Sequence, residues 1–140
     1  MDSYEIFKRF LDNEEFKYAE GEIGDGDRVL RIPQKIQNGG MVNVVFVFAE
    51  YKIKIAVLGI AAIEDKGKRV EFYKLFNDFN KEYAFLKMYM HSDGNICVDV
   101  DFALELIKGE FQPRALMSFA AMALNAVGKV YPDIMKIQSA

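Results

Sequence analysis

Apolar and polar positions along the chain follow two different periods, and the changes of period mark the predicted elements. After Asp2 and Ser3, either of which can cap a helix, apolar residues recur every three or four positions and predict an amphipathic helix that ends at residues 13–15. The following segments alternate or run continuously apolar, as strands do. Strands are predicted, with mixed alternation in the first, at 16–23, 28–37, 41–50 and 52–63.

Pro33 lies inside the second of these predicted strands. Proline has no N–H to donate to a neighbouring strand, so it is confined to edge strands and bulges. We therefore expect the strand of residues 28–37 to lie at an edge of the sheet or to contain a bulge. The Asn38-Gly39-Gly40 segment that follows it predicts a tight hairpin turn, since these residues tolerate a positive φ.

From residue 64 onward the helical period returns. One helical face is expected to carry Val70, Tyr73, Phe76, Phe79, Asn80 and Tyr83. A hairpin of residues 84–90 and 95–102 follows, joined at Asp93-Gly94, and Pro113 opens a last helix that we expect to end at Tyr131-Pro132, with one further turn at 133–137. The buried stripe of that helix is predicted to be Leu116, Phe119, Ala120, Ala123, Leu124 and Val127.

The order of elements is helix, three or four strands, helix, two strands, helix. Hairpin-linked strands interrupted by a few helices predict an α+β domain in which helices cover a largely antiparallel sheet. No linker, repeat or low-complexity segment interrupts residues 1–140, so we expect one domain.

The strand of residues 84–90 carries apolar side chains on both faces, and more methionines lie on the last helix. Filling of the core explains such residues in most proteins, but methionine also adapts to different partners. The residues that we expect at a contact surface are Phe85, Met88, Tyr89, Met90, Met117 and Met122.

Composition excludes several classes of protein. The chain has 51% hydrophobic residues and a net charge of −3, which suits a globular domain and argues against a nucleic-acid or anionic-membrane surface. No apolar run is long enough to span a bilayer, and the first residues lack the apolar stretch of a signal peptide, so a cytoplasmic location is expected. A single cysteine excludes an internal disulfide.

Few residues of this chain could carry catalytic chemistry. There is no threonine, and His91 and Cys97 are the sole histidine and cysteine. No helix start or cation in the sequence lowers the pKa of Cys97, so we expect neither an enzyme nor a bound cofactor. His91, Asp93, Asp99 and Asp101 form the one metal-like cluster, but strand alternation predicts that Asp99 and Asp101 face solvent, and no metal is expected.

Asn77 and Asn80 lie one turn apart near the end of the second predicted helix. Asparagine amides in such positions often bind backbone groups of the next segment. A role in capping and a role in a polar ligand site or interface both remain open at this point.

Several segments together resemble the YbjN-like family. They are Asn77-x-x-Asn80, Phe85-x-Lys87-x-Tyr89, Asp93-Gly94 with the strand after it, and the stretches at 31–40 and 126–137. The resemblance implies a helix–sheet–helix fold similar to type III secretion chaperones, often dimeric and without accepted catalytic residues. It also implies a sensory-transduction or chaperone-like role.

Two functions are compatible with these patterns. The first is a non-enzymatic interaction module, chaperone-like or regulatory, that forms a homodimer through an apolar sheet or helix surface and binds a protein client. The alternative is a small-ligand sensor with a pocket between the sheet and the last helix. Room for that pocket would come from the small residues Ala120, Ala121, Ala123 and Ala126.

Overall fold

The computed structural model describes residues 2–24, 26–104 and 110–140. Within these ranges the helices are α1 (Ser3–Asn13), α2 (Arg69–Glu82) and α3 (Pro113–Ser139), and a 3-10 turn, η1 (Lys66–Lys68), precedes α2. The strands are β1 (Ala19–Ile23), β2 (Asp27–Lys35), β3 (Met41–Phe48), β4 (Lys52–Leu58), β5 (Lys87–Met90) and β6 (Ile96–Ala103).

The strands form one antiparallel sheet in the order β1-β2-β3-β4-β6-β5. Four strands follow α1 before the chain leaves the sheet for α2, and it returns as the hairpin of β5 and β6. The predicted α+β class and the helix–antiparallel-sheet–helix order are confirmed.

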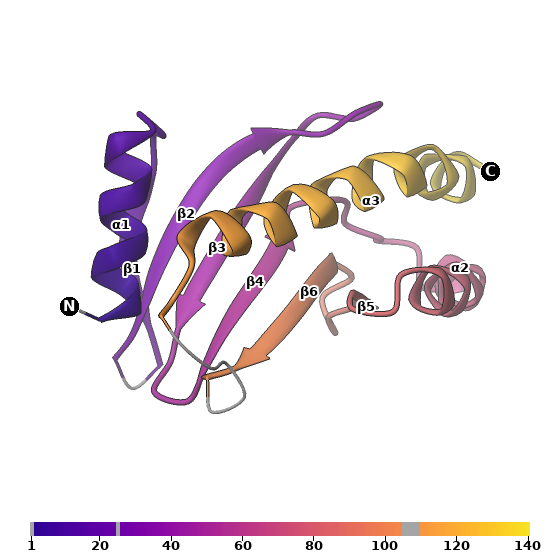
Figure 1. Cartoon of the computed structure of the whole chain (residues 1–140). Helices are drawn as coiled ribbons and strands as arrows, with labels where there is room; N and C mark the ends of the chain where they lie inside the picture. The colour runs from indigo at the N-terminus through magenta and orange to yellow at the C-terminus, as the bar shows by residue number, and fades with distance from the viewer. Residues whose placement is uncertain (1, 25, 105–109) are drawn as a thin grey trace.

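The two faces of the sheet have different surroundings. The inner face carries Ile53, Ile55 and Val57 of β4 and packs with residues of all three helices in one core. Figure 1 shows α3 crossing in front of β3 and β4, with α1 beside β1 and α2 beyond β5. The outer face carries the alternate residues, and its small buried cluster of Val29, Val45 and Ala56 comes from strands alone.

Three predicted strands are longer than the observed ones by at least three residues, and those of residues 28–37 and 41–50 each end two residues later than β2 and β3 do. β1 begins at Ala19 rather than residue 16, and β5 begins at Lys87 rather than residue 84. β4 ends at Leu58 because Gly59, with φ of +78°, turns the chain out of the strand. The apolar residues after Gly59 therefore fill the core from a loop, which strand periodicity alone could not reveal.

The prediction that the Pro33 strand lies at the sheet edge is wrong, because β2 lies between β1 and β3. The missing N–H is nevertheless harmless. Ile36 N donates to Gly40 O at 3.1 Å, so by alternation the backbone of Pro33 faces away from β3. The side that Pro33 does face has no strand partner at this position, because the pairing of β1 with β2 extends only as far as Arg31, which pairs with Ala19.

The predicted buried face of α2 is rotated from the observed one. Phe72, Phe76 and Phe79 are buried, whereas Val70 and Tyr73 are 64% and 53% exposed. The helix lies at the margin of the sheet, packed on β5 and α3, so its buried stripe is narrow. A 3.6-residue period fits several neighbouring stripes on such an aromatic-rich helix.

The predicted end of the last helix at Tyr131-Pro132 is also wrong, because α3 continues through Pro132 to Ser139. Proline removes the hydrogen bond to the carbonyl four residues earlier, which here belongs to Gly128. Asn38 Nδ2 donates to that carbonyl oxygen at 3.4 Å. The side chain of Asn38, in the β2–β3 turn, thus partly replaces the bond that Pro132 removes.

Tyr4 joins α1 to the sheet. It is 4% exposed, its hydroxyl donates to Glu20 of β1, and the guanidinium of Arg28 lies 3.5 Å from its ring centroid. Burial and the Glu20 carboxylate raise the pKa of Tyr4 from 10.0 to about 12. The neutral phenol is therefore favoured in the folded state.

Stability should fall between about pH 10 and pH 12 in part because of this residue. Over that range an unfolded Tyr4 has lost its proton while the folded one retains it, so raising the pH favours unfolding. Tyr4→Phe should make this alkaline loss smaller by on the order of 2 kcal/mol. Urea unfolding of both proteins across this range measures the difference, and parallel pH profiles would contradict the assignment.

Candidate functional site

The middle of the outer face is an apolar stripe formed by β2, β3 and β4. Val29 pairs with Val47, and Val45 pairs with Ala56. Leu58 extends the stripe along β4. Among the described residues, only strands contribute to this cluster. We call Val29, Val45, Val47, Ala56 and Leu58 the outer stripe.

A buried carboxylate lies beside the outer stripe on β6. Asp99 is 2% exposed and accepts a hydrogen bond from the Tyr89 hydroxyl at 2.7 Å. The Nζ atoms of Lys54 and Lys87 lie 3.8 and 3.7 Å from its carboxylate oxygens. The expectation that Asp99 faces open solvent is therefore wrong, because the side chains of the flanking strands close over it.

Asp101, two residues further along β6, remains exposed and pairs with Lys52 at 3.4 Å. On this side of the sheet three lysines, Lys52, Lys54 and Lys87, share two aspartates, so one positive charge is left over. This part of the outer face is polar without being strongly charged.

Cys97 and His91 do not form a nucleophilic site. Burial and the nearby Asp99 raise the pKa of the Cys97 thiol to about 11, so it is protonated at neutral pH and unreactive. The ring of His91 lies edge-on to Tyr89, with centroids 5.2 Å apart. Asp93 accepts hydrogen bonds from Asn95 in the turn, and the described part of the chain holds no group of three acidic, His or Cys residues suited to a metal.

Asn80 binds the exposed edge of β5. Met88 N donates to Asn80 Oδ1 at 2.7 Å, and Asn80 Nδ2 donates to Met88 O at 3.2 Å. β5 is the last strand of the sheet, so these backbone groups face away from β6. The amide of Asn80 occupies the place of a further strand, which blocks pairing at this edge.

Asn80→Ala should lower the free energy of unfolding by about 1.5 kcal/mol, because it leaves two part-buried backbone groups unpaired. Asn77→Ala is the matched control, since Asn77 lies on the same helix, is exposed, and has no side-chain hydrogen bond to the described residues. Its effect should stay within about 0.5 kcal/mol. Urea unfolding compares them, and equal effects would contradict a special role for Asn80.

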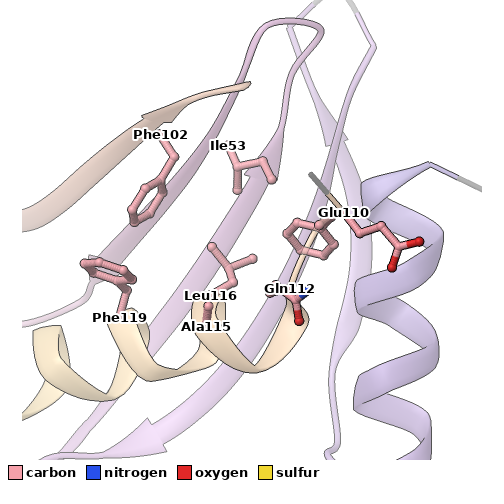
Figure 2. A pocket seen from close by; sticks show the side chains of 8 residues that line it. Ile53, Phe102, Glu110, Gln112, Ala115, Leu116 and Phe119 are labelled. Atoms are coloured by element: carbon pink, nitrogen blue, oxygen red, sulfur yellow. The ribbon is translucent and has the colours of Figure 1, made fainter. Parts of the chain in front are cut away.

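An apolar cavity of about 250 Å³ lies between the inner face of the sheet and the first turns of α3. Figure 2 shows Ile53 and Phe102 reaching from the sheet toward Leu116 and Phe119 of the helix. Phe102 and Phe119 are in edge contact, with ring centroids 4.9 Å apart. The remaining lining residues are Glu110, Phe111, Gln112 and Ala115.

The six expected contact residues divide into three groups. Phe85 and Met122 are exposed on the helix side, at 71% and 37%, and Tyr89 lies on the outer face. Met90 and Met117 are partly buried at the margin of the core. Met88 is 1% exposed, so its expected place at an interface is corrected: it packs inward because β5 turns Met88, not Tyr89, toward the helices.

Sequence reasoning missed most residues of these two sites. A signal for the outer stripe did exist, because β3 reads Val-Val-Phe-Val and so places apolar side chains on both faces. The cavity had no such signal, since Ile53, Phe102 and Phe119 are far apart in the sequence. Of the four alanines expected to leave room, Ala123 and Ala126 are fully packed, whereas Ala120 and Ala121 line a second cavity of about 200 Å³.

No helix in the described ranges has the length and apolar character needed to cross a bilayer. A family model described as "YbjN: Putative bacterial sensory transduction regulator" matches residues 3–135. A crystal structure of YbjN from E. coli, described as "a putative transcription regulator", superposes with a TM-score of 0.68 over 98% of this chain and 94% of that chain. At 11% identity this likeness concerns the fold alone. No curated protein matches the sequence.

Proposed function

Because the chain belongs to the YbjN family, described as "Putative bacterial sensory transduction regulator", we propose that it is a regulator that acts by binding rather than by catalysis. We propose further that it binds a second copy of itself through the outer face of its sheet. The outer stripe is the observation that carries this proposal. Val29, Val45 and Ala56 are buried by neighbouring side chains of the sheet, and Val47 and Leu58 remain partly exposed on a face to which the described helices contribute no buried residue. Antiparallel sheets with two apolar faces commonly pack face to face.

The charges around the outer stripe favour a second copy as the occupant. Asp99 and Asp101 are paired with Lys52, Lys54 and Lys87 within the chain. This pairing leaves one positive charge among the five groups, so it reduces the repulsion between two such faces without removing it. The paired groups form a polar rim, as in many protein interfaces.

The size of the face is also adequate. Six strands spaced about 4.8 Å apart give the outer face a projected area of roughly 600 Å². A standard interface buries about 800 Å² of accessible surface on each partner, and accessible area exceeds projected area where side chains protrude. A dimer formed through this face would thus reach the standard size.

Light scattering on the purified chain tests the proposal. The expected mass at tens of micromolar is twice the 16.0 kDa of the chain, since standard-size interfaces hold at such concentrations. A mass of one chain under the same conditions would count against self-association. Chaperone-like action on a protein client is a finer prediction that needs a separate search for the client.

A further inference from the structure

We propose that the cavity between the sheet and the start of α3 binds a small apolar molecule with a flat ring and at most one polar group. This site goes beyond the proposed self-association and lies on the inner side of the sheet, opposite the outer stripe. We define it by its five apolar walls, which are Ile53, Phe102, Phe111, Leu116 and Phe119.

The size of the cavity sets the size of the ligand. An apolar cavity of about 150 Å³ lined by leucine, isoleucine and phenylalanine holds benzene. The present cavity has the same kinds of wall and a volume of about 250 Å³, so it accommodates a bicyclic ring. A bicyclic ring suits this volume better than a nucleotide does, because sites for drug-sized ligands span about 300 to 1,000 Å³.

The walls also set the shape of the ligand. Phe102 and Phe119 meet at 68° with centroids 4.9 Å apart. Phe111 also lines the cavity, and its ring centroid lies 6.4 Å from that of Phe7 on α1. A flat ring can contact the edge or face of each phenyl group at favourable geometry. Phe102 and Phe119 are each half-buried, so ring faces remain available to a ligand.

Among the described lining residues, the polar side chains are those of Glu110 and Gln112, at one end of the cavity. Gln112 and Glu110 are exposed there, and Figure 2 shows the Glu110 carboxylate directed away from the rings. A polar atom carried deep between the phenylalanines would lose its hydrogen bonds to water without replacement. The one polar group of the ligand must therefore lie near Gln112, whose amide can donate or accept.

Indole and purine form a matched pair of probes, because both are bicyclic and of equal size but purine carries ring nitrogens on every side. Indole should bind once per chain by titration calorimetry. At ten times its Kd it should raise the melting temperature by about 4 °C. Purine should cause no measurable shift, whereas equal binding of both probes would overturn the proposal.

Two alanine substitutions on α3 locate the site. Ala115→Leu adds bulk to the cavity described here, while Ala121→Leu adds it to the second cavity on the same helix, and both positions are exposed. Ala115→Leu should weaken indole binding at least tenfold, and Ala121→Leu should leave it unchanged. The assignment would be overturned if only the Ala121→Leu variant lost indole binding, or if neither variant lost it.

Phe119→Ala removes one wall and serves as the second variant if Ala115→Leu does not fold, with at least fivefold weaker binding expected. Unchanged indole binding by a folded Phe119→Ala variant would overturn the proposal.

The mass of each sample by light scattering separates the ligand-site proposal from the proposal of self-association. A monomer that binds indole would contradict self-association alone, and a dimer that does not would contradict the ligand site alone.

Discussion

Replacing Gly94 by alanine is expected to lower the free energy of unfolding by about 3 kcal/mol. Gly94 has φ of +92°, and a Cβ atom there would lie 2.3 Å from the carbonyl oxygen of Ile63. The turn would have to move away from that segment. Its movement would break the hydrogen bonds from Ile63 N to Gly94 O at 2.8 Å and from Ile96 N to Ala61 O at 2.9 Å.

Two further glycines separate the causes of this effect. Gly24 has φ of +55° with open space around its Cβ position, so Gly24→Ala should cost about 1 kcal/mol from backbone strain alone. Gly21 has open space and no positive φ, so Gly21→Ala should be neutral or slightly stabilising. Urea unfolding gives all three values. A Gly94 variant no worse than the Gly24 variant would show that the contact with Ile63 does not matter.

Val47→Glu is expected to weaken the proposed dimer at least 100-fold, which corresponds to about 3 kcal/mol. Val47 is half-buried in the outer stripe, opposite Lys54 on β4. In a symmetric dimer each substitution counts twice, so two carboxylates would be buried in an apolar interface. In the single chain Lys54 can pair with the new glutamate, so the fold should be retained. Sedimentation at a series of concentrations measures the change.

Phe85→Glu is the matched control for this experiment. Phe85 is 71% exposed on the helix side and touches Phe119, with ring centroids 6.3 Å apart. Because it lies away from the outer face, its replacement should leave the dimer intact. If the Phe85→Glu variant dissociated while the Val47→Glu variant remained a dimer, the interface would lie on the helix side, where Met122 is also exposed.

The order of elements was predictable because the strongest local signals decide it. Asn38 adopts φ of +66° in the turn after β2, as the Asn-Gly-Gly segment predicts. Asp2 caps α1 by accepting from Glu5 N at 2.9 Å, and Pro113 opens α3. These features depend on neighbours within a few residues, so the sequence contains all that is needed.

The environment of each face was less predictable, since alternation says which residues share a face but not what covers them. Asp99 and Asp101 share one face, yet Asp99 is enclosed by Tyr89 and Lys54 while Asp101 is exposed. That difference depends on β6 lying between β4 and β5. The placement of β6 follows from the crossover through α2, which no local pattern encodes.

The cavity illustrates the same limit more strongly. Ile53, Phe102 and Phe119 come from β4, β6 and α3 and meet only in the assembled fold. Methionine content drew attention to Met88 and Met117, which the structure places in or beside the core. In a strand of residues 84–90 alternation would place Phe85 on the same face as Tyr89, but β5 begins two residues after Phe85, so the alternation does not extend to it.

The distance between nitroxide labels in the two copies of the proposed dimer tests the interface most directly. With Cys97→Ser as background, labels at Val47→Cys should lie within about 20 Å of each other, since stacked sheets are about 10 Å apart. Labels at Phe85→Cys, on the opposite side of the sheet, should be separated by at least 30 Å, or roughly three such layers. A Phe85→Cys pair closer than the Val47→Cys pair would contradict self-association through the outer face.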